Sequence, residues 1–328
     1  MEKTTIHDVA ERAGVSVTTV SRVLNNRGYI SDEMRNKVGK AIEELNYTPN
    51  HLARSFYNNK TMSIGLIIPT INNPFFGELA FYIEKELANK NYNLYICNSL
   101  NDLNNELKYL KLLKEKKVDG LIVGSHNIAR SEYDKVENKV VSIERAINNN
   151  IPIIQSDNYS GGKLATEELI NNGCKNILCI VGNKILDMPA NNRADAYKEI
   201  MQRENLDVKI KEIPFNLSIN EKKSIVEEIL KKSCYDGIFA GDDLMAGLVV
   251  AEAANLGIKV PTELKVIGFD GSNIFRIISP HISTIQQPIE KLSKTAVSVI
   301  LDLIDNKLVE QKYVHSVKLI ASNSTSSD

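Results

Sequence analysis

The stretch TIHDVAERAGVSVTTVSRVLN, residues 5–25, decides how the N-terminal part of this chain folds. Its apolar side chains, and those of the segment that continues to residue 46, recur at helical spacing and show no strand-like alternation. These positions are Ile6, Val9, Ala10, Ala13, Val20, Val23, Leu24, Met34, Val38, Ile42 and Leu45. We expect three short helices, with Gly14 ending the first, Ser16 capping the second and Ser31 capping the third.

The second of these helices, within residues 16–25, has the two faces that a DNA-reading helix needs. One face is apolar and packs inward, while small polar groups, a guanidinium and an amide turn outward to base edges or phosphates. The outward residues are Val17, Thr18, Ser21, Arg22 and Asn25, and further phosphate contacts are expected from Thr5, Ser16, Thr19 and Ser31. Any amphipathic helical trio exposes some polar side chains, so the pattern alone leaves DNA binding and a plain surface role open.

The run DVAERAGVSVTTVSRVLN, residues 8–25, closely resembles the lactose and galactose repressor family of bacterial transcription regulators, whose members share the pattern D-V-A-x-x-A-G-V-S-x-x-T-V-S-R-V-x-N. The resemblance implies a helix-turn-helix head. It continues through LNYTPNHLAR, residues 45–54, which is similar to the family's hinge, a segment that orders in the minor groove of an operator. The hinge residues that it places on DNA are Asn50, Ala53, Arg54 and Phe56, the last standing where the family usually has a wedging leucine.

From residue 63 onward, short apolar and β-branched runs alternate with amphipathic helical segments. The runs are SIGLIIP, NLYICNS, VDGLIVG, NILCIVG, KIKEIPF, DGIFAGD and LKVIGFD. This alternation is typical of βαβ units and parallel sheets, and two sheets are more economical than one very wide sheet. We therefore predict an α/β fold: a three-helix helix-turn-helix head and a hinge, then two Rossmann-like lobes, which the resemblance identifies as the periplasmic sugar-binding type.

The expected domain boundaries follow from these changes in the pattern of apolar residues. The helix-turn-helix domain spans 1–47, the hinge spans 48–61, and the effector-binding and dimerisation domain spans 62–328. Within the last domain, we expect the first lobe to take residues 62–160 plus 289–303 and the second to take 161–288 plus 304–322.

Polar segments follow the ends of the predicted strands, where open α/β sheets bind their ligands. Sugars are held by aromatic faces and by planar polar groups that satisfy their hydroxyls. The candidate effector-binding residues are Asn72, Phe75, Phe76, Ser125, His126, Glu144, Asp157, Arg193, Asp242, Asp270 and Gln287. Each residue taken alone has an ordinary interpretation as a core, capping or surface residue, and their convergence on strand ends is what favours one common site.

The resemblance assigns roles to four of these residues. Arg193 stands in the slot of the family's effector-gripping arginine, Asp242 holds a hydroxyl, and Asp270 belongs to a G-F-D element. Glu144 replaces the aspartate of the family's D-R pair, and its longer side chain reshapes the pocket. The strings ARS, DGLIVGSHN, SDNYSGG, DDL and VIGFDG resemble the sucrose-operon branch of the family, and this resemblance favours an effector of the sucrose or fructose type. A phosphorylated sugar stays open, because His126, Arg193 and Lys163 are cationic or titratable groups near the proposed mouth.

Composition narrows the classes of function. Lys and Arg number 40 against 41 Asp and Glu, and residues 1–60 hold nine basic against seven acidic residues, so no strong overall attraction to nucleic acid is expected. The four cysteines lack paired spacing, so we predict no metal and no cofactor. Dinucleotide, phosphate-loop and nucleophile-elbow motifs are missing, which argues against an enzyme. No signal peptide or membrane-length apolar run is seen, so we expect a cytoplasmic protein.

The expected partners are operator DNA, a sugar or sugar-phosphate effector and a second copy of the chain, since a two-fold operator needs a homodimer; no membrane is involved. The effector closes the lobes, separates the hinges and so acts as an inducer. Two other interpretations stay open: a repressor activated by a purine-like corepressor, and a sugar-binding receptor without a regulatory role. Some family members also bind a phosphocarrier protein as corepressor, which this sequence neither supports nor excludes.

Overall fold

The computed structural model describes residues 4–24, 28–47, 60–125, 130–136, 139–183, 188–232 and 235–326. The chain divides into two compact units, Met1–Met62 and Ser63–Asp328. In its described part, no helix is long and apolar enough to cross a membrane.

The described residues of the smaller unit form three helices, which the sequence predicted. They are α1 (Ile6–Ala13), α2 (Val17–Leu24) and α3 (Asp32–Glu44). Thr5 begins α1 with a reciprocal capping box: its hydroxyl accepts from the backbone N–H of Asp8, whose carboxylate accepts from the backbone N–H of Thr5. Gly14 ends the helix with a φ of 65°, a left-handed conformation that glycine adopts without strain. The three helices share a small core that includes the fully buried Val9, Val20 and Val38.

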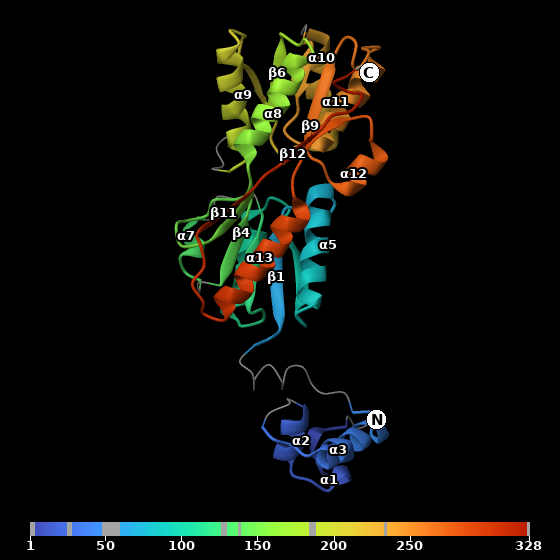
Figure 1. The fold of residues 1–328 in the computed structure, drawn as a ribbon, viewed down its shortest axis with the longest axis vertical. Coiled ribbons are helices and arrows are strands. Elements are labelled where there is room, and N and C mark those ends of the chain that lie inside the picture. Colours follow the sequence, from blue (N-terminus) through green and yellow to red (C-terminus); the bar gives the residue numbers. More distant parts are fainter. Residues whose placement is uncertain are drawn as a thin grey trace. The chain divides into compact units, whose positions relative to one another are not determined.

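The described part of the larger unit contains two six-stranded sheets, each from its own lobe (Figure 1). The first sheet has the order β11-β5-β4-β3-β1-β2 and the second has the order β12-β10-β9-β8-β6-β7. The strands of the first sheet are β1 (Ser63–Ile68), β2 (Asn93–Asn98), β3 (Gly120–Val123), β4 (Val140–Ile143), β5 (Ile153–Ser156) and β11 (Lys312–His315). Those of the second sheet are β6 (Ile177–Val181), β7 (Lys209–Glu212), β8 (Gly237–Phe239), β9 (Lys265–Asp270), β10 (Ser283–Gln286) and β12 (Lys318–Ile320).

Helices cover both sheets, as right-handed βαβ crossovers require. In the first lobe they are α5 (Pro74–Ala88), α6 (Leu103–Lys114), α7 (Arg130–Tyr133) and α13 (Ile289–Ile304). In the second lobe they are α8 (Asn158–Asn171), α9 (Asn191–Arg203), α10 (Ile219–Lys232), α11 (Asp243–Asn255) and α12 (Asn273–Ile278). The central strands β1 and β3 are buried along their whole length, which explains why they read as continuous apolar runs.

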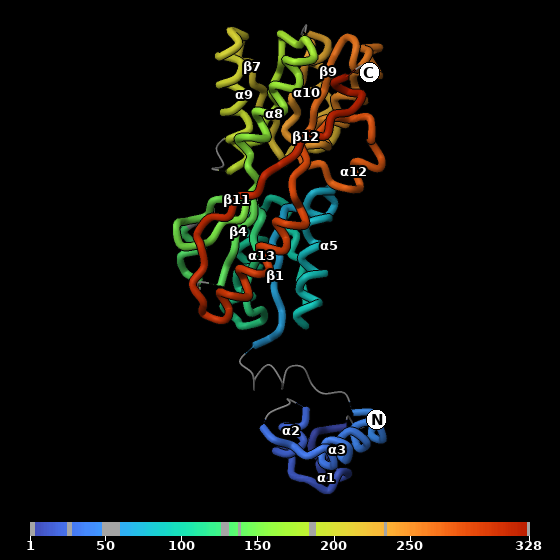
Figure 2. The backbone as a smooth tube through the Cα atoms, viewed as in Figure 1, coloured from blue at the N-terminus to red at the C-terminus, as the bar shows by residue number. Residues whose placement is uncertain are grey.

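The described chain passes between the lobes at three places, which can be followed in Figure 2: after β5, after β10 and after β11. The third passage differs from our expectation, which put all of residues 304–322 in the second lobe. Lys312–His315 instead pair in parallel with β5 and complete the first sheet, and only β12 joins the second sheet, antiparallel to β10. One edge of each sheet lies along this segment, and each of the two short strands pairs with one of these edges. Apolar periodicity does not encode which sheet a strand joins.

Candidate functional site

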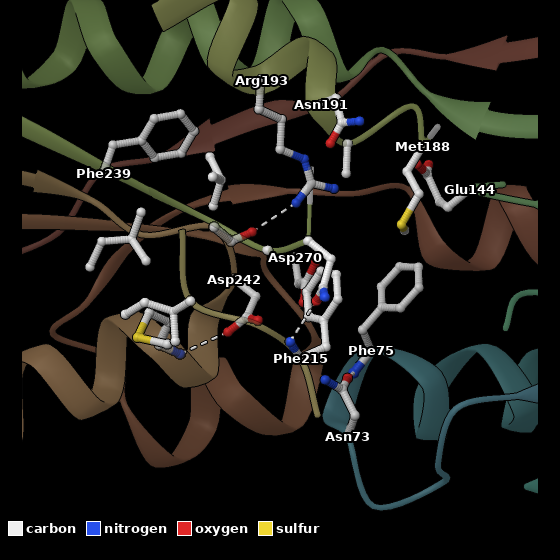
Figure 3. Close-up of a pocket in the computed structure, with 18 of the residues that line it drawn as sticks. Asn73, Phe75, Glu144, Met188, Asn191, Arg193, Phe215, Phe239, Asp242 and Asp270 are labelled. Atoms are coloured by element: carbon white, nitrogen blue, oxygen red, sulfur yellow. Dashed lines mark hydrogen bonds between the residues drawn. The ribbon is translucent and has the colours of Figure 1, made fainter. Parts of the chain in front are cut away.

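A cavity of about 130 Å³ lies between the two lobes, at the carboxyl ends of the strands (Figure 3). Asn73, Phe75, Phe76 and Glu144 line it from the first lobe. Its second-lobe wall consists of Cys179, Ile180, Val181, Gly182, Asn183, Met188, Ala190, Asn191, Arg193, Ile213, Phe215, Lys222, Phe239, Gly241, Asp242, Met245, Asp270 and Gln287. A closure or opening of the lobes therefore changes this cavity directly.

Arg193, in the first turn of α9, supplies a buried guanidinium to the cavity. Its Nε donates to Oδ1 of Asn158 at 2.7 Å, and its Nη1 donates to the carbonyl oxygen of Gly241 at 2.8 Å. The guanidinium carbon lies 3.4 Å from the ring centroid of Phe269, so the planar group is stacked as well as hydrogen-bonded. These contacts fix its orientation before any ligand arrives. In Figure 3 it extends from α9 toward Asp270.

Three aspartates gather beside this arginine. Asp242 caps α11, since its Oδ1 accepts from the backbone N–H of Met245 at 2.7 Å. Asp270 ends β9 in a left-handed conformation with a φ of 123°, and its Oδ1 accepts from Nε2 of Gln287 at 2.7 Å. Burial, together with the nearby carboxylates, raises the pKa of Asp270 well above its ordinary value.

The third aspartate, Asp243, is buried behind the cavity wall. It accepts from the hydroxyl of Thr284 at 2.6 Å and from the backbone N–H of Gly271 at 2.7 Å. Burial raises the pKa of Asp243 to about 7, and these two hydrogen bonds oppose that effect. The three aspartates in and behind the cavity wall thus interact with one arginine.

Glu144 connects the first lobe to Arg193 through a buried relay of hydrogen bonds. Its carboxylate accepts from the backbone N–H of Ser156 and, at 2.8 Å, from Nδ2 of Asn158, the residue that also accepts from Arg193. Burial raises the pKa of Glu144, and the charge of Arg193 opposes this. Gln287 makes a parallel link, since its Oε1 accepts from the hydroxyl of Ser156 at 2.7 Å while its amide holds Asp270. Both relays run through interlobe crossings, so they tie the geometry of the site to that of the lobes.

Most of the effector-binding candidates line the cavity, and some do not. The residues brought together are Phe75, Phe76, Glu144, Arg193, Asp242, Asp270 and Gln287. Asn72 is absent from the lining, where its neighbour Asn73, the cap of α5, takes its place. Asp157 instead caps α8 by accepting from the backbone N–H of Ser160 at 3.0 Å. His126 lies outside the described residues.

Ser125 also lies away from the lining, in a buried polar cluster of the first lobe. Its hydroxyl donates to Glu106 at 2.6 Å and accepts from Nη1 of Arg145 at 2.8 Å, and Glu106 and Arg145 form an ion pair at 2.7 Å. The Arg145 charge, with hydrogen bonds from Ser125 and the Tyr133 hydroxyl, outweighs burial and lowers the pKa of Glu106. Ser125 therefore hydrogen-bonds within this cluster and does not line the cavity.

Sequence analysis missed several lining residues, of which Phe215 is the most informative. It ends the run KIKEIPF, so the strand-end rule that selected the other candidates could have found it. Its backbone N–H donates to Oδ1 of Asn183 at 2.9 Å. Gly182 makes room for its ring, because a Cβ at that position would lie 2.1 Å from Cζ of Phe215. Met188 and Asn191 stand before and within the start of α9, where no periodic signal marked them.

The second candidate surface is on α2. Arg22 and Thr18 are exposed there, and the hydroxyls of Ser16 and Thr19 lie 2.9 Å apart while Ser16 also accepts from the backbone N–H of Thr19. Ser21 is half-buried on the same helix. Val17, which we expected to face outward, packs partly against the head's core. Of the other DNA-binding candidates, Thr5 and Ser31 cap α1 and α3. Five more lie outside the described residues: Asn25, Asn50, Ala53, Arg54 and Phe56.

Metal binding has no structural support in the part of the chain that is described: no group of three His, Cys, Asp or Glu side chains there could hold a metal ion. Cys97 and Cys174 are buried thiols, and burial raises the pKa of Cys97 to about 11 and that of Cys174 to about 12. These two thiols are therefore neutral at physiological pH.

Comparison with known proteins agrees with both halves of the structure. Residues 5–50 match the family described as bacterial regulatory proteins, lacI family, and residues 166–325 match the periplasmic binding protein-like domain. The sucrose operon repressor of Pediococcus pentosaceus is 42% identical over 97% of this chain and 98% of its own length.

Two solved structures share the fold. A periplasmic binding protein/LacI transcriptional regulator from Alkaliphilus metalliredigens QYMF, complexed with D-xylulofuranose, is 34% identical with a TM-score of 0.71 and covers 80% of this chain and 99% of that one. The Lac repressor dimer bound to operator and an anti-inducer has a TM-score of 0.85 at 22% identity, with 99% of each chain covered. The 42% identity to the Pediococcus repressor extends over nearly the whole chain. This chain therefore belongs to the lacI family of bacterial regulatory proteins.

Proposed function

We propose that this lacI-family repressor controls a carbohydrate-utilisation operon and is released from its operator by a sugar bound between the lobes. The observation that carries the proposal is the composition of the cavity. It combines aromatic rings, Phe75, Phe76 and Phe215, with a fixed guanidinium and carboxylates. Aromatic faces stack on the apolar faces of sugars, and carboxylate and guanidinium groups satisfy hydroxyls in pairs.

The size of the cavity and the relatives favour a small sugar of the fructose or sucrose type. A volume of about 130 Å³ accommodates on the order of ten water-sized positions, which suits a monosaccharide or one ring of a disaccharide. The Alkaliphilus regulator is complexed with a furanose, and the Pediococcus relative is a sucrose operon repressor. A flat purine is a poorer match, because the lining offers several carboxylates as partners for hydroxyl groups, which a purine base does not carry.

Homodimer formation belongs to the same proposal. Exposed apolar side chains gather on three neighbouring elements, with Phe81 on α5, Tyr95 and Ile96 on β2, and Ile274 and Ile277 on α12. Helix α5 packs against both β2 and α12, so these side chains belong to one region of the larger unit. A second copy of the chain is the partner that a two-fold operator requires.

The coupling between sugar and DNA follows from the relays in the cavity wall. A ligand that contacts Phe75 in one lobe and Arg193 in the other favours one lobe arrangement over the alternatives. Since the dimer region spans both lobes, a change of lobe arrangement alters how the two copies present their α2 helices. Binding of sugar and binding of operator are then linked, and each weakens the affinity for the other by the same factor.

A thermal-shift screen of the purified chain tests the proposed effector class. The ligands are sucrose, fructose, ribose, their phosphates and purine bases, each at concentrations up to about 100 times the expected Kd, which adds about 2.7 kcal/mol of stability when binding occurs. We expect sugars to raise the melting temperature. A shift with purines and none with sugars would contradict the sugar effector and leave the DNA-binding assignment intact.

Two pairs of variants separate the DNA-binding and sensing roles. Arg22→Ala is expected to abolish operator binding while keeping the sugar shift, and Lys37→Ala, an exposed site on α3, is its control. Arg193→Ala is expected to keep operator binding and lose induction, with the exposed Arg203→Ala on the same helix as its control. Arg193→Lys retains the charge without the planar fork and should also fail to respond. Normal operator binding by Arg22→Ala would show that α2 is not the reading helix.

A further inference from the structure

Charge is distributed very unevenly around the interlobe cavity. The guanidinium of Arg193 interacts electrostatically with four carboxylates at once: Glu144, Asp242, Asp243 and Asp270. Three of these four line the cavity, and Asp243 lies directly behind it. One cation therefore already balances a group of anions that exceeds it in number.

The donors of Arg193 are also partly committed. Its Nε donates to Asn158 and its Nη1 donates to the carbonyl oxygen of Gly241. The ring of Phe269 covers one face of the guanidinium. A guanidinium that grips a phosphate offers two parallel N–H groups to it, with no competing anions nearby. Here the competing carboxylates belong to the cavity wall itself. The guanidinium therefore stabilises these carboxylates and can donate to uncharged acceptors of a ligand.

The other basic residue among the described lining residues is Lys222. It belongs to α10, is half-exposed, and its Nζ donates to the carbonyl oxygen of Phe215 at 3.2 Å. This contact places its ammonium beside the Phe215 backbone rather than among the aspartates. We call the three lining carboxylates, Asp242, Asp270 and Glu144, the carboxylate floor of the cavity. No second cation from the described wall neutralises this floor.

The repulsion of an anion by these carboxyl groups is strongest when Asp270 and Glu144 are ionised. When Asp270 and Glu144 are ionised, they repel an incoming phosphate; when they are protonated, they present O–H and C=O groups without adding positive charge. Burial raises the pKa of both carboxyl groups, and the neighbouring carboxylates raise that of Asp270 further. A sugar hydroxyl, which donates and accepts, pairs with either state.

From this arrangement, and resting on the proposed function, we propose that the effector is an uncharged sugar and that the cavity rejects the phosphate ester of the same sugar. Asp242, Asp270 and Glu144 act as the residues that set this specificity, since the described wall offers no compensating cation to an anion placed against them. The physiological signal is then the free sugar itself, or one released by hydrolysis, rather than the product of a sugar kinase or a phosphorylating uptake system.

Calorimetric titration of the full-length protein with matched ligand pairs tests the proposal. The pairs are fructose with fructose 6-phosphate and sucrose with sucrose 6-phosphate. In at least one pair we expect the free sugar to bind at least tenfold more tightly than its ester, a difference of about 1.4 kcal/mol. An ester that binds as tightly as its sugar, or more tightly, overturns this inference and leaves the proposed sugar-responsive repressor standing. Binding of purines alone overturns both.

A charge-neutralising variant assigns the discrimination to the floor. Asp242→Asn keeps the hydrogen bond that caps α11, because an amide oxygen can also accept from Met245, and it removes one negative charge from the lining. We expect it to narrow the ratio of ester to sugar dissociation constants at least threefold. Asp102→Asn, which neutralises the exposed cap of α6 away from the lining, is the control and should leave the ratio unchanged. An unchanged ratio in Asp242→Asn, or an equal change in both variants, contradicts the role of the floor.

Discussion

Replacement of Gly162 by alanine probes how the position of Arg193 is fixed. Gly162 lies on α8, where a Cβ would come within 2.4 Å of the carbonyl oxygen and 2.7 Å of the Cα of Arg193. These are backbone atoms that cannot rotate away, so α9 must move off α8 by roughly half an ångström. The guanidinium moves with the helix, although its acceptors on Asn158 and Gly241 belong to other segments.

The size of the effect follows from two opposing contributions. Overpacking a buried contact costs about 1–3 kcal/mol, whereas exchanging a helical glycine for alanine returns up to about 1 kcal/mol. We therefore expect the free energy of unfolding to fall by about 1–2 kcal/mol. Loss of one charge-assisted hydrogen bond of Arg193 is worth about 1.5–3 kcal/mol, so sugar affinity should fall tenfold or more.

Urea denaturation and calorimetric titration of the same preparation measure both quantities. The matched control is Gly247→Ala on α11, where the nearest atom to a new Cβ is the Phe275 ring at 3.7 Å, an ordinary contact. That variant should be as stable as the parent or slightly more stable and should bind sugar normally. If Gly162→Ala were stable and bound sugar with unchanged affinity, the packing of α8 against α9 would not be what positions Arg193.

Three further substitutions address other parts of the account. Glu78→Ala removes a carboxylate on α5 that bridges the two lobes, where it accepts from the backbone N–H of Asn273 at 2.6 Å and from its Nδ2 at 2.8 Å. The variant should bind sugar several-fold more weakly in calorimetry. An unchanged Kd would exclude this bridge as a determinant of lobe closure. Asp243→Asn tests linkage: burial raises the pKa of Asp243 to about 7, so the stability that its proton provides is complete below pH 4 and is lost as pH rises through 7. In urea titrations between pH 5 and pH 8 the parent should lose about 2 kcal/mol more than the variant, and parallel pH profiles would refute the assignment. Thr5→Ala removes the capping box with Asp8 and should destabilise the head by about 1 kcal/mol, seen as faster hydrogen exchange in α1; unchanged exchange would show that the cap is not needed.

Local signals predicted the head almost residue by residue. Ser16 and Ser31 cap their helices through their hydroxyls and Gly14 ends α1 through its left-handed backbone, because capping depends on groups within three residues along the chain. Val17 is the exception: it was expected to face outward, yet it packs partly against the head core. Outward and inward directions at the first turn of an eight-residue helix depend on how its neighbours cross it, which one helix's periodicity cannot show.

The cavity was predictable where it depends on strand ends and not where it depends on exact side-chain direction. Parallel strands end at one edge, so Arg193, Asp242 and Asp270 converge as the strand-end rule requires. Asn72 and Asn73 follow the same strand, but only the second lines the cavity, because it is the one that caps α5. A shift by one residue reverses such an assignment, and a sequence without a structure does not fix it.

The pairing of strands far apart in the sequence was the other feature that the sequence did not predict. Nothing in the residues after α13 distinguished which sheet each of the last two strands would join, since both are short and partly exposed. Ser125 gives the same lesson at the level of one side chain: its buried partners Glu106 and Arg145 come from elements 19 and 20 residues away. Such contacts join residues far apart in the sequence, so local patterns do not predict them.

The central claim is that a sugar in the interlobe cavity and operator DNA on the head influence each other's affinity. The most direct test measures operator affinity by fluorescence anisotropy with and without saturating sugar, and sugar affinity by calorimetry with and without saturating operator, using an operator selected from random duplex DNA by the full-length protein. We expect the sugar to weaken operator binding at least tenfold, and the operator to weaken sugar binding by the same factor, with both effects lost in Arg193→Ala. Sugar that binds without changing operator affinity would contradict the account.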